Sequence, residues 1–158
     1  MRHFPAPFFL LAAALLGVVM PGCSAGSTPA AVPSGWVREC PGEQFCFSRP
    51  ADLKLQPVQV IDSLAGVYRS ETLTLRFDLG RYGTSSRHLA NPAEEAVTID
   101  DRPARMLVTE REIMLLVPKV HPSGPFTIQF GMQLQSSQTA SRDLALRIFK
   151  TIEFRPPR

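Results

Sequence analysis

Three cysteines are the side chains whose chemistry is most closely constrained by position: Cys23, Cys40 and Cys46. Residues 41–45, between the last two, are Pro-Gly-Glu-Gln-Phe, a turn-forming stretch that can bring the two sulfur atoms together. An even pair of thiols is expected where cysteine oxidises, whereas zinc would need further Cys or His ligands at suitable spacing. We therefore predict a Cys40–Cys46 disulfide, no metal site and no cofactor.

A long polar segment, Gly80–Glu95, carries the hydroxyl and imidazole groups that could do nucleophilic chemistry. Ser85 or Ser86, with His88 as the base, would suit a small hydrolase. The chain has no Gly-x-Ser-x-Gly elbow, however, and an exposed loop histidine is the simpler interpretation. Long irregular loops on a rigid sheet often carry function. We assign no catalytic residue and predict a contact surface in this segment, formed by Arg81, Tyr82, Arg87 and His88.

Paired acids and a second histidine complete the residues that could do chemistry. Glu94-Glu95 follows Asn91-Pro92, which predicts the start of a turn, and Asp100-Asp101 lies at a predicted hairpin tip. Calcium requires about six to eight oxygens in an organised array, so both pairs are interpreted as solvated charge. His121 precedes Pro122 in a Pro-Ser-Gly stretch and is predicted to be a turn residue.

The apolar run Phe8–Met20 has no polar side chain, and Arg2 is the only charge ahead of it. At a helical rise of about 1.5 Å per residue the run covers roughly 20 Å, which is short of the ~30 Å hydrocarbon thickness of a bilayer. A basic start, a short apolar stretch and small residues after it are typical of a secretory signal peptide. We expect residues 1–22 to be that signal peptide.

The residues at the end of the leader, Met20-Pro21-Gly22-Cys23, resemble the lipobox of bacterial lipoproteins. The resemblance implies a diacylglyceryl thioether on the Cys23 sulfur, cleavage before Cys23, and usually a third acyl chain on the new amino terminus. Gly22 fits the pattern, whereas Met20 and Pro21 depart from it. Ordinary cleavage after Ala25, which would discard Cys23, stays open as the alternative.

Residues 23–35 are predicted to be a lipidated tether, because Ser24–Ser34 is small, uncharged and interrupted by prolines. Two or more acyl chains hold a protein stably on a bilayer. Ser24, directly after the lipidated position, resembles lipoproteins that are passed on to an outer membrane. The resemblance therefore implies that the membrane is a partner through the lipid anchor. It places the domain at the outer membrane, facing the periplasm.

Residues 36–158 are enough for one domain with a single core. The whole chain has a formal net charge of +3, and removing residues 1–22 takes away Arg2 and no acid, which leaves +2. This near-neutral balance argues against a nucleic-acid partner, which would require many more basic residues on one face.

Hydrophobic periodicity in this domain mostly predicts strands. Thr72–Leu79 and Phe126–Gln135 alternate apolar and polar residues, as strands with one buried face do. Ile113–Val117 is apolar on both faces and suits a central strand. The remaining predicted strands are a hairpin of Val97–Ile99 and Ala104–Val108 around residues 100–103, together with Phe45–Ser48 and Ala65–Arg69.

Near the end of the chain the period changes to that of a helix. Ser141 can cap its first turn. Asp143 lies near the N-terminus and Lys150 near the C-terminus of this helix, where the helix dipole favours an acidic and a basic side chain, respectively. Leu144 and Ile148 share one face, which should pack on a sheet. A short strand within residues 151–154 follows. Antiparallel strands with one packed helix make an α+β layered architecture.

This order of elements loosely resembles that of PsbP/Mog1-like domains. Such chains also open with an aromatic-rich stretch, here residues 45–50 (Phe-Cys-Phe-Ser-Arg-Pro), and close with a helix leading into an Ile-x-Phe strand, here Ile148–Phe154. The resemblance implies the layered α+β fold and assigns no functional residue.

The sequence thus favours a non-enzymatic, membrane-anchored module that binds an envelope protein or another envelope component. Two alternatives remain: a small periplasmic hydrolase that uses a loop serine and histidine, and an inhibitor of a periplasmic enzyme. A protruding rigid loop would be the structural sign of the inhibitor.

Overall fold

The structure is a computed structural model that describes residues 32–81, 85–123 and 126–155. Several predictions concern residues outside these ranges. They are the signal peptide 1–22, the lipidation site Cys23, most of the tether, and Tyr82 of the expected contact surface. The structure therefore bears on the domain from Trp36 onward.

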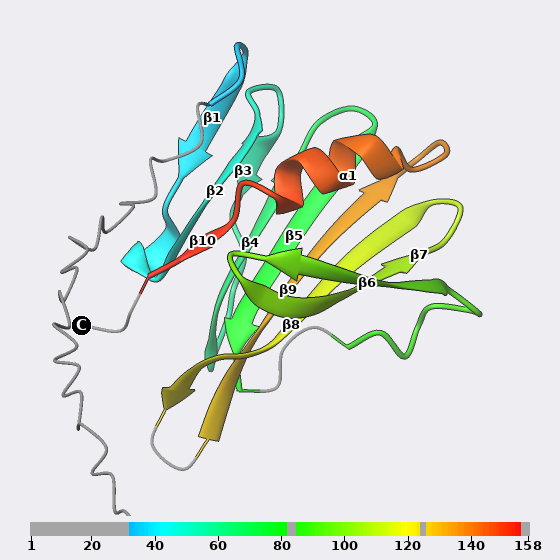
Figure 1. Cartoon of the computed structure of the whole chain (residues 1–158). Helices are drawn as coiled ribbons and strands as arrows, with labels where there is room; N and C mark the ends of the chain where they lie inside the picture. Colours follow the sequence, from blue (N-terminus) through cyan, green and yellow to red (C-terminus); the bar gives the residue numbers. More distant parts are fainter. Residues whose placement is uncertain (1–31, 82–84, 124–125, 156–158) are drawn as a thin grey trace, which may run out of the picture.

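The larger of two sheets has seven antiparallel strands in the order β3-β4-β5-β9-β8-β7-β6 (Figure 1). Its strands are β3 (Lys54–Gln56), β4 (Ser63–Arg69), β5 (Leu73–Gly80), β6 (Ala93–Ile99), β7 (Arg102–Val108), β8 (Glu112–Ser123) and β9 (Phe126–Ser136). β9 lies between β5 and β8, and β6 lies at the opposite edge of the sheet from β3. The connection from β5 to β6 must therefore pass β9, β8 and β7.

A second layer covers one face of this sheet (Figure 1). It consists of a three-stranded sheet in the order β1-β2-β10 and of helix α1. The elements are β1 (Trp36–Glu39), a 3-10 turn η1 (Pro41–Glu43), β2 (Phe45–Pro50), α1 (Arg142–Phe149) and β10 (Glu153–Phe154). The Ser141 side chain accepts a hydrogen bond from the Leu144 backbone N–H at 3.2 Å, which confirms the predicted N-cap. The α+β prediction is confirmed.

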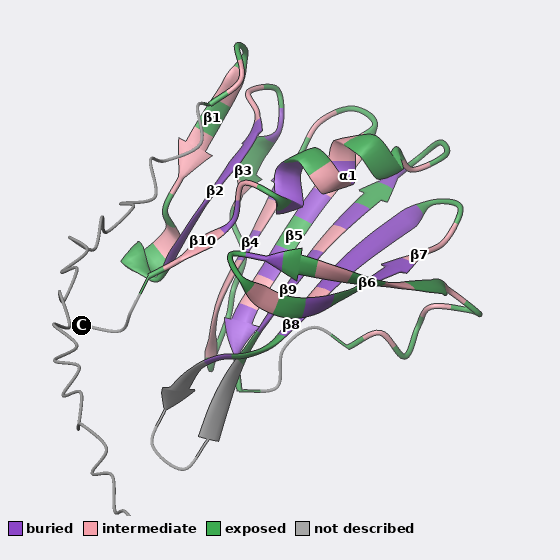
Figure 2. Cartoon of the chain, in the orientation of Figure 1, coloured by how far each residue is buried: buried purple, intermediate pink, exposed green. Residues whose placement is uncertain are grey.

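The core lies between the two layers and is rich in aromatic rings. Phe45 of β2 packs edge-on against Phe77 and Phe130 of the large sheet, with ring centroids 5.1 and 4.8 Å apart. Phe47 likewise meets Tyr68, at 5.7 Å. Figure 2 shows the buried residues running along β2 and the central strands. The aromatic stretch at residues 45–50 thus joins the small sheet to the large one.

We call the face of the large sheet that meets this second layer the inner face, and the opposite one the outer face. In β5 the predicted alternation is confirmed, since Leu75, Phe77 and Leu79 are buried on the inner face. The cross-strand register carries the same alternation through the sheet. The outer-face residues of β5, β8 and β9 include Thr74, Arg76, Asp78, Glu112, Met114, Gln133 and Gln135.

Two apolar side chains of the outer face are also buried. Leu107 and Met114 lie opposite each other in β7 and β8, with 4 % and 0 % of their surface exposed. The β5–β6 connection crosses this face, because His88 within it contacts Glu112 of β8. Ile113–Val117 is apolar on both sides because Ile113, Leu115 and Val117 are buried in the core and Met114 is buried on the outer face. Its predicted place in the sheet interior is confirmed, since β8 lies between β9 and β7.

The hairpin between β6 and β7 turns at Asp100 and Asp101, as predicted. Both residues have positive φ, at 49° and 58°. A two-residue turn with left-handed backbone at both positions matches the right-handed twist of the strands. Aspartate tolerates this conformation better than most residues, which explains why Asp-Asp can serve here.

Two predicted turns are instead strands. Glu94 and Glu95 belong to β6, where the Arg105 Nη1 lies 3.3 Å from the Glu94 Oε1 and Arg142 donates two hydrogen bonds to the Glu95 carboxylate. These partners let two adjacent acids sit in an edge strand. His121 lies in β8, with its backbone in register with Ile128, beyond an irregularity between Val117 and His121.

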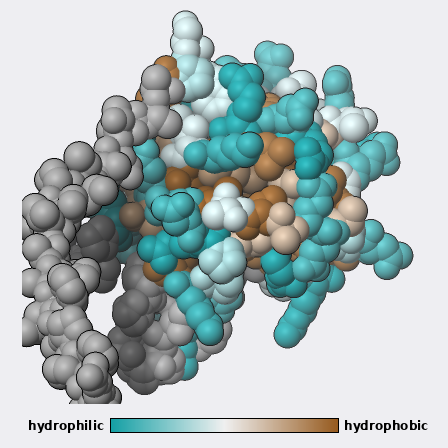
Figure 3. Space-filling model, viewed as in Figure 1, coloured by the Kyte–Doolittle hydropathy of each residue, from teal (hydrophilic) through white to brown (hydrophobic). Residues whose placement is uncertain are grey.

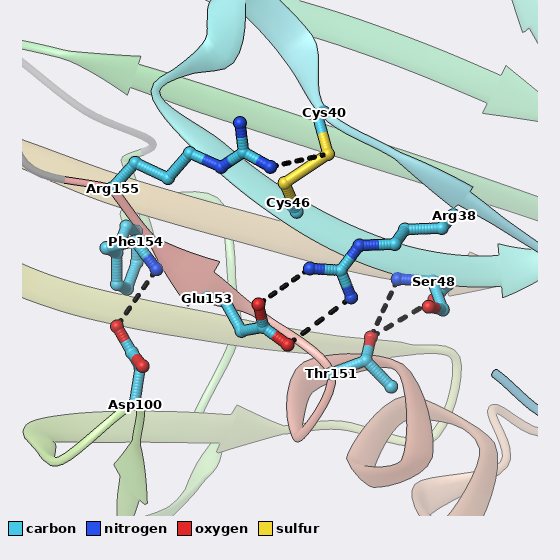
Figure 4. A network of polar contacts seen from close by, with 9 residues as sticks. All are labelled: Arg38, Cys40, Cys46, Ser48, Asp100, Thr151, Glu153, Phe154 and Arg155. Carbon is cyan, nitrogen blue, oxygen red and sulfur yellow. Dashed lines mark hydrogen bonds and ion pairs between the residues drawn. A yellow bond between two sulfur atoms is a disulfide. The ribbon is translucent and has the colours of Figure 1, made fainter. Parts of the chain in front are cut away.

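The short C-terminal strand β10 is held by polar contacts that the hydrophobic pattern does not predict (Figure 4). The Phe154 backbone N–H donates to Asp100 Oδ2 at 2.9 Å, and Arg38 donates to both carboxylate oxygens of Glu153, at 3.3 and 2.6 Å. The Ser48 N–H donates to Thr151 Oγ1 at 2.8 Å. These contacts tie β10 to β1, to β2 and to the β6–β7 turn.

Seen from the side of α1 and the small sheet, the described surface is mainly hydrophilic, with smaller hydrophobic areas between charged side chains (Figure 3). None of the helical segments that the structure describes is both long and apolar enough to cross a bilayer.

Candidate functional site

The Cys40–Cys46 disulfide is confirmed. The two Cα atoms are 4.1 Å apart, and the 3-10 turn η1 closes the loop between them. Cys46 is fully buried beside the aromatic core, whereas Cys40 lies toward solvent, where Arg155 Nη2 is 3.6 Å from its sulfur (Figure 4). The bond therefore fastens the start of β2 to β1.

The expected contact surface lies on the β5–β6 connection, and three of its four residues are described. Arg81, Arg87 and His88 are all exposed. The Arg81 carbonyl accepts a hydrogen bond from Gln129 Nε2 at 3.4 Å. The connection is thus attached to β9 near its start, and its basic side chains remain accessible to a partner.

His88 is held by a buried acid that the sequence did not single out. His88 Nε2 lies 2.8 Å from Glu112 Oε1, and the imidazole is 51 % exposed while the Glu112 side chain is only 9 % exposed. Gln133 Nε2 donates to the same carboxylate oxygen. A buried carboxylate requires such donors, since desolvation without them is costly. Sequence spacing gives no signal for this contact, because 24 residues separate the partners.

The serines expected near His88 are arranged differently from a catalytic pair. Ser85 Oγ accepts a hydrogen bond from the Arg87 backbone N–H at 3.3 Å. His88 directs Nε2 to Glu112, and within the described part of the chain neither Ser85 nor Ser86 forms a hydrogen bond with its imidazole. The arrangement therefore lacks the nucleophile–base contact that activates a serine.

Ser85 does border a hollow of about 320 Å³ on the outer face. Residues of β4, β5 and β9 form its floor, among them Val67, Arg76 and Asp78. Val58 and Val60, from the connection before β4, form part of its rim. The hollow thus joins the β3–β4 connection to the expected contact surface.

Exposed apolar side chains concentrate at this same edge of the sheet. We call Leu55, Val58, Val60 and Ile61 the apolar edge segment; they are exposed by 63 %, 42 %, 45 % and 92 %. They make up four of the six large hydrophobic residues that are exposed in the described part of the chain. An isolated exposed apolar residue is ordinary, whereas a cluster marks an interaction site. The sequence signal was present, as Val-Gln-Val-Ile at 58–61 lies outside every predicted strand.

Two ionisable groups elsewhere have shifted pKa values. The hydrogen bonds from Arg142 lower the pKa of the Glu95 carboxyl. Burial, followed by the nearby Glu39 charge, raises the pKa of the Tyr68 hydroxyl. Both groups contact structural partners, so neither shift marks a catalytic centre. No group of three or more His, Cys, Asp or Glu side chains suited to a metal ion occurs among the described residues.

Comparison of the chain with protein-family models, with curated proteins and with solved structures found no match. The functional argument therefore depends on the geometry of this chain alone.

Proposed function

We propose that this chain is an exported lipoprotein, anchored through Cys23, whose domain binds another protein of the cell envelope without catalysing a reaction. The single observation that carries the binding proposal is the apolar edge segment, Leu55, Val58, Val60 and Ile61, beside the outer-face hollow. The β5–β6 connection borders the same hollow through Ser85 and would add Arg81, Arg87 and His88 to the contact.

The physical reason is the cost of leaving these side chains in water. Burying one aliphatic side chain contributes roughly 1.5–3 kcal/mol relative to full exposure, and Ile61 has almost its whole surface available. The adjacent strand β3 is the edge of the large sheet and is only three residues long. An edge strand leaves backbone hydrogen-bonding groups open to a second chain. A partner at this edge would bury the exposed apolar side chains and pair with the open backbone groups of β3.

The anchoring proposal draws support from the leader and from the disulfide. Disulfides persist in compartments outside the reducing cytoplasm, and Cys40 is bonded to Cys46. Intact-mass analysis of the membrane fraction tests this step. Acylation on a mature chain beginning at Cys23 is the expected result. A soluble chain cleaved after Ala25 would contradict the anchor, and untrimmed cytosolic protein would contradict export as well.

Co-purification tests the binding step. The double substitution Val60→Ser and Ile61→Ser should abolish recovery of a specific envelope partner, because it removes two exposed apolar side chains without touching the core. Val37→Ser is the matched control, since Val37 is 39 % exposed on β1 in the other layer. Equal recovery with both variants would contradict the proposed surface.

A hydrolase has one supporting observation, the His88–Glu112 contact next to a hollow bordered by Ser85. Activation of Ser85 would require its hydroxyl to donate to the free ring nitrogen of His88. Labelling with a serine-reactive phosphonate, compared with a Ser85→Ala variant, tests this alternative. Labelling that disappears in the variant would favour the hydrolase over the binding module.

A further inference from the structure

A second polar hollow, of about 380 Å³, lies where the β4–β5 turn meets the end of β9. Arg69 and Arg111 border it, and hydroxyl side chains line much of the remainder. A neighbouring hollow of about 450 Å³ shares residues 69–72 with it and adds Asp52 and Lys54. This end of the sheet therefore combines a concave shape with an excess of basic over acidic side chains, and it uses none of the apolar edge segment.

The two arginines differ from five of the other arginines in the described part of the chain. Arg38, Arg49, Arg102, Arg105 and Arg142 each lie within 4.0 Å of a carboxylate. Arg69 and Arg111 have no such partner among the described residues, although Glu71 borders the same hollow. A guanidinium presents a planar set of N–H donors that fits the oxygens of carboxylate and phosphate.

Two hydroxyl groups in the hollow are already oriented. Ser70 Oγ accepts from the Leu73 N–H at 3.2 Å, and Ser136 Oγ accepts from the Gln138 N–H at 3.1 Å. Neither hydroxyl donates a hydrogen bond to another described residue, so each has its proton left to donate. Ser136 is only 7 % exposed and is thus a buried donor at the hollow.

We propose that this basic hollow, defined by Arg69, Arg111, Ser70 and Ser136, binds a phosphate group carried on a small hydroxyl-bearing molecule. Two guanidinium groups that each donate a pair of N–H groups, together with two hydroxyls, offer more donors than the roughly four lone-pair sites of a carboxylate accept. The three terminal oxygens of a phosphate monoester can accept all of these donors. The volume exceeds that of a phosphate ion alone, and Gln135 with the neighbouring threonines can bond hydroxyl groups of the carrier. A phospholipid headgroup and a soluble glycerol or sugar phosphate share this chemistry.

The test is an NMR titration of the full chain with glycerol 3-phosphate, using Cys23→Ala throughout so that an acyl anchor does not interfere. Saturable shifts at the amides of residues 69–72 and 136 are expected. The double substitution Arg69→Gln and Arg111→Gln should weaken binding by roughly tenfold or more. Arg87→Gln is the control, because Arg87 is exposed, lacks an ion pair among the described residues and lies outside the hollow.

Co-sedimentation with phosphatidylglycerol vesicles distinguishes the two sources. Binding that the double substitution removes would identify a lipid headgroup, and glycerol 3-phosphate binding without vesicle binding would identify a soluble phosphate. Unsaturable shifts, or equal weakening by Arg87→Gln, would overturn the proposal. The unfolding midpoints of all variants should agree, because the three arginines are exposed. Lost binding together with a lowered midpoint would also count against a specific site.

Discussion

His88 Nε2 lies 2.8 Å from Glu112 Oε1 and thereby links a long surface connection to a buried carboxylate on the outer face of β8. The contact lies next to Met114, which is completely buried on the outer face. It therefore attaches the β5–β6 connection to the outer face of the sheet, close to this apolar side chain. The same connection carries the residues expected to contact a partner.

His88→Ala should loosen this connection. Removing the imidazole leaves the Glu112 carboxylate with the Gln133 amide as its remaining side-chain donor, and we expect a loss of about 1 kcal/mol in the free energy of unfolding. Amide hydrogen exchange at residues 85–89 should accelerate more than exchange in β8. Arg87→Ala, which removes an exposed neighbour, should change neither. Unchanged exchange in His88→Ala would show that the contact does not hold the connection.

Gly66→Ala should destabilise the sheet through a steric clash. A Cβ at position 66 would lie 2.5 Å from Cε1 of the Phe77 ring, which packs over this glycine from β5. Overpacking of this kind costs about 1–3 kcal/mol, measurable by urea unfolding. In a Phe77→Leu background the cost of Gly66→Ala should shrink, since the ring is gone. An undiminished cost there would assign the effect to the backbone instead.

Loss of the Cys40–Cys46 bond should destabilise the domain by about 2 kcal/mol, from the entropy of the small loop it closes. The double substitution Cys40→Ala and Cys46→Ala is the test, with denaturant unfolding as the measurement. Wild-type protein in reductant should lose a similar amount. Stability that responds to neither change would show that the loop is already ordered by β1 and β2 pairing.

Arg142→Gln should raise the pKa of Glu95, because hydrogen bonds from Arg142 hold that pKa below its usual value. A carboxyl whose pKa is lower in the folded state stabilises the fold above its unfolded pKa. That contribution is lost as pH falls through the folded value. NMR titration of the Glu95 carboxyl carbon measures the shift. Arg147→Gln, on the same helix but stacked on Trp36, should leave it unchanged.

Most of the fold could be predicted because it follows from local patterns. The alternation in β5 and β9, the doubly apolar Ile113–Val117 and the capping by Ser141 each appear within a few residues. The short edge strands β1 and β3 could not be predicted, since three or four residues carry too little periodicity. Their pairing partners supply the hydrogen bonds that make them strands.

The candidate site was only partly predictable for a related reason. The exposed loop with Arg87 and His88 is visible as a long polar segment, but its contact with Glu112 depends on where β8 lies in the sheet. Glu94-Glu95 suggested a turn because the sequence does not show that Arg105 and Arg142 would meet these acids. For the apolar edge segment, the sequence shows only that the apolar residues at 58–61 lie outside every predicted strand, and the folded chain shows that they are exposed.

Site-specific photo-crosslinking in living cells tests the central claim most directly. A photoreactive amino acid is placed at Ile61 of the full chain, and a second variant carries it at Val37 as the control. The proposal predicts one discrete protein adduct from position 61 and none from position 37, lost again when Val60→Ser is added. No adduct at position 61, or the same adducts from both positions, would contradict a partner at the apolar edge segment.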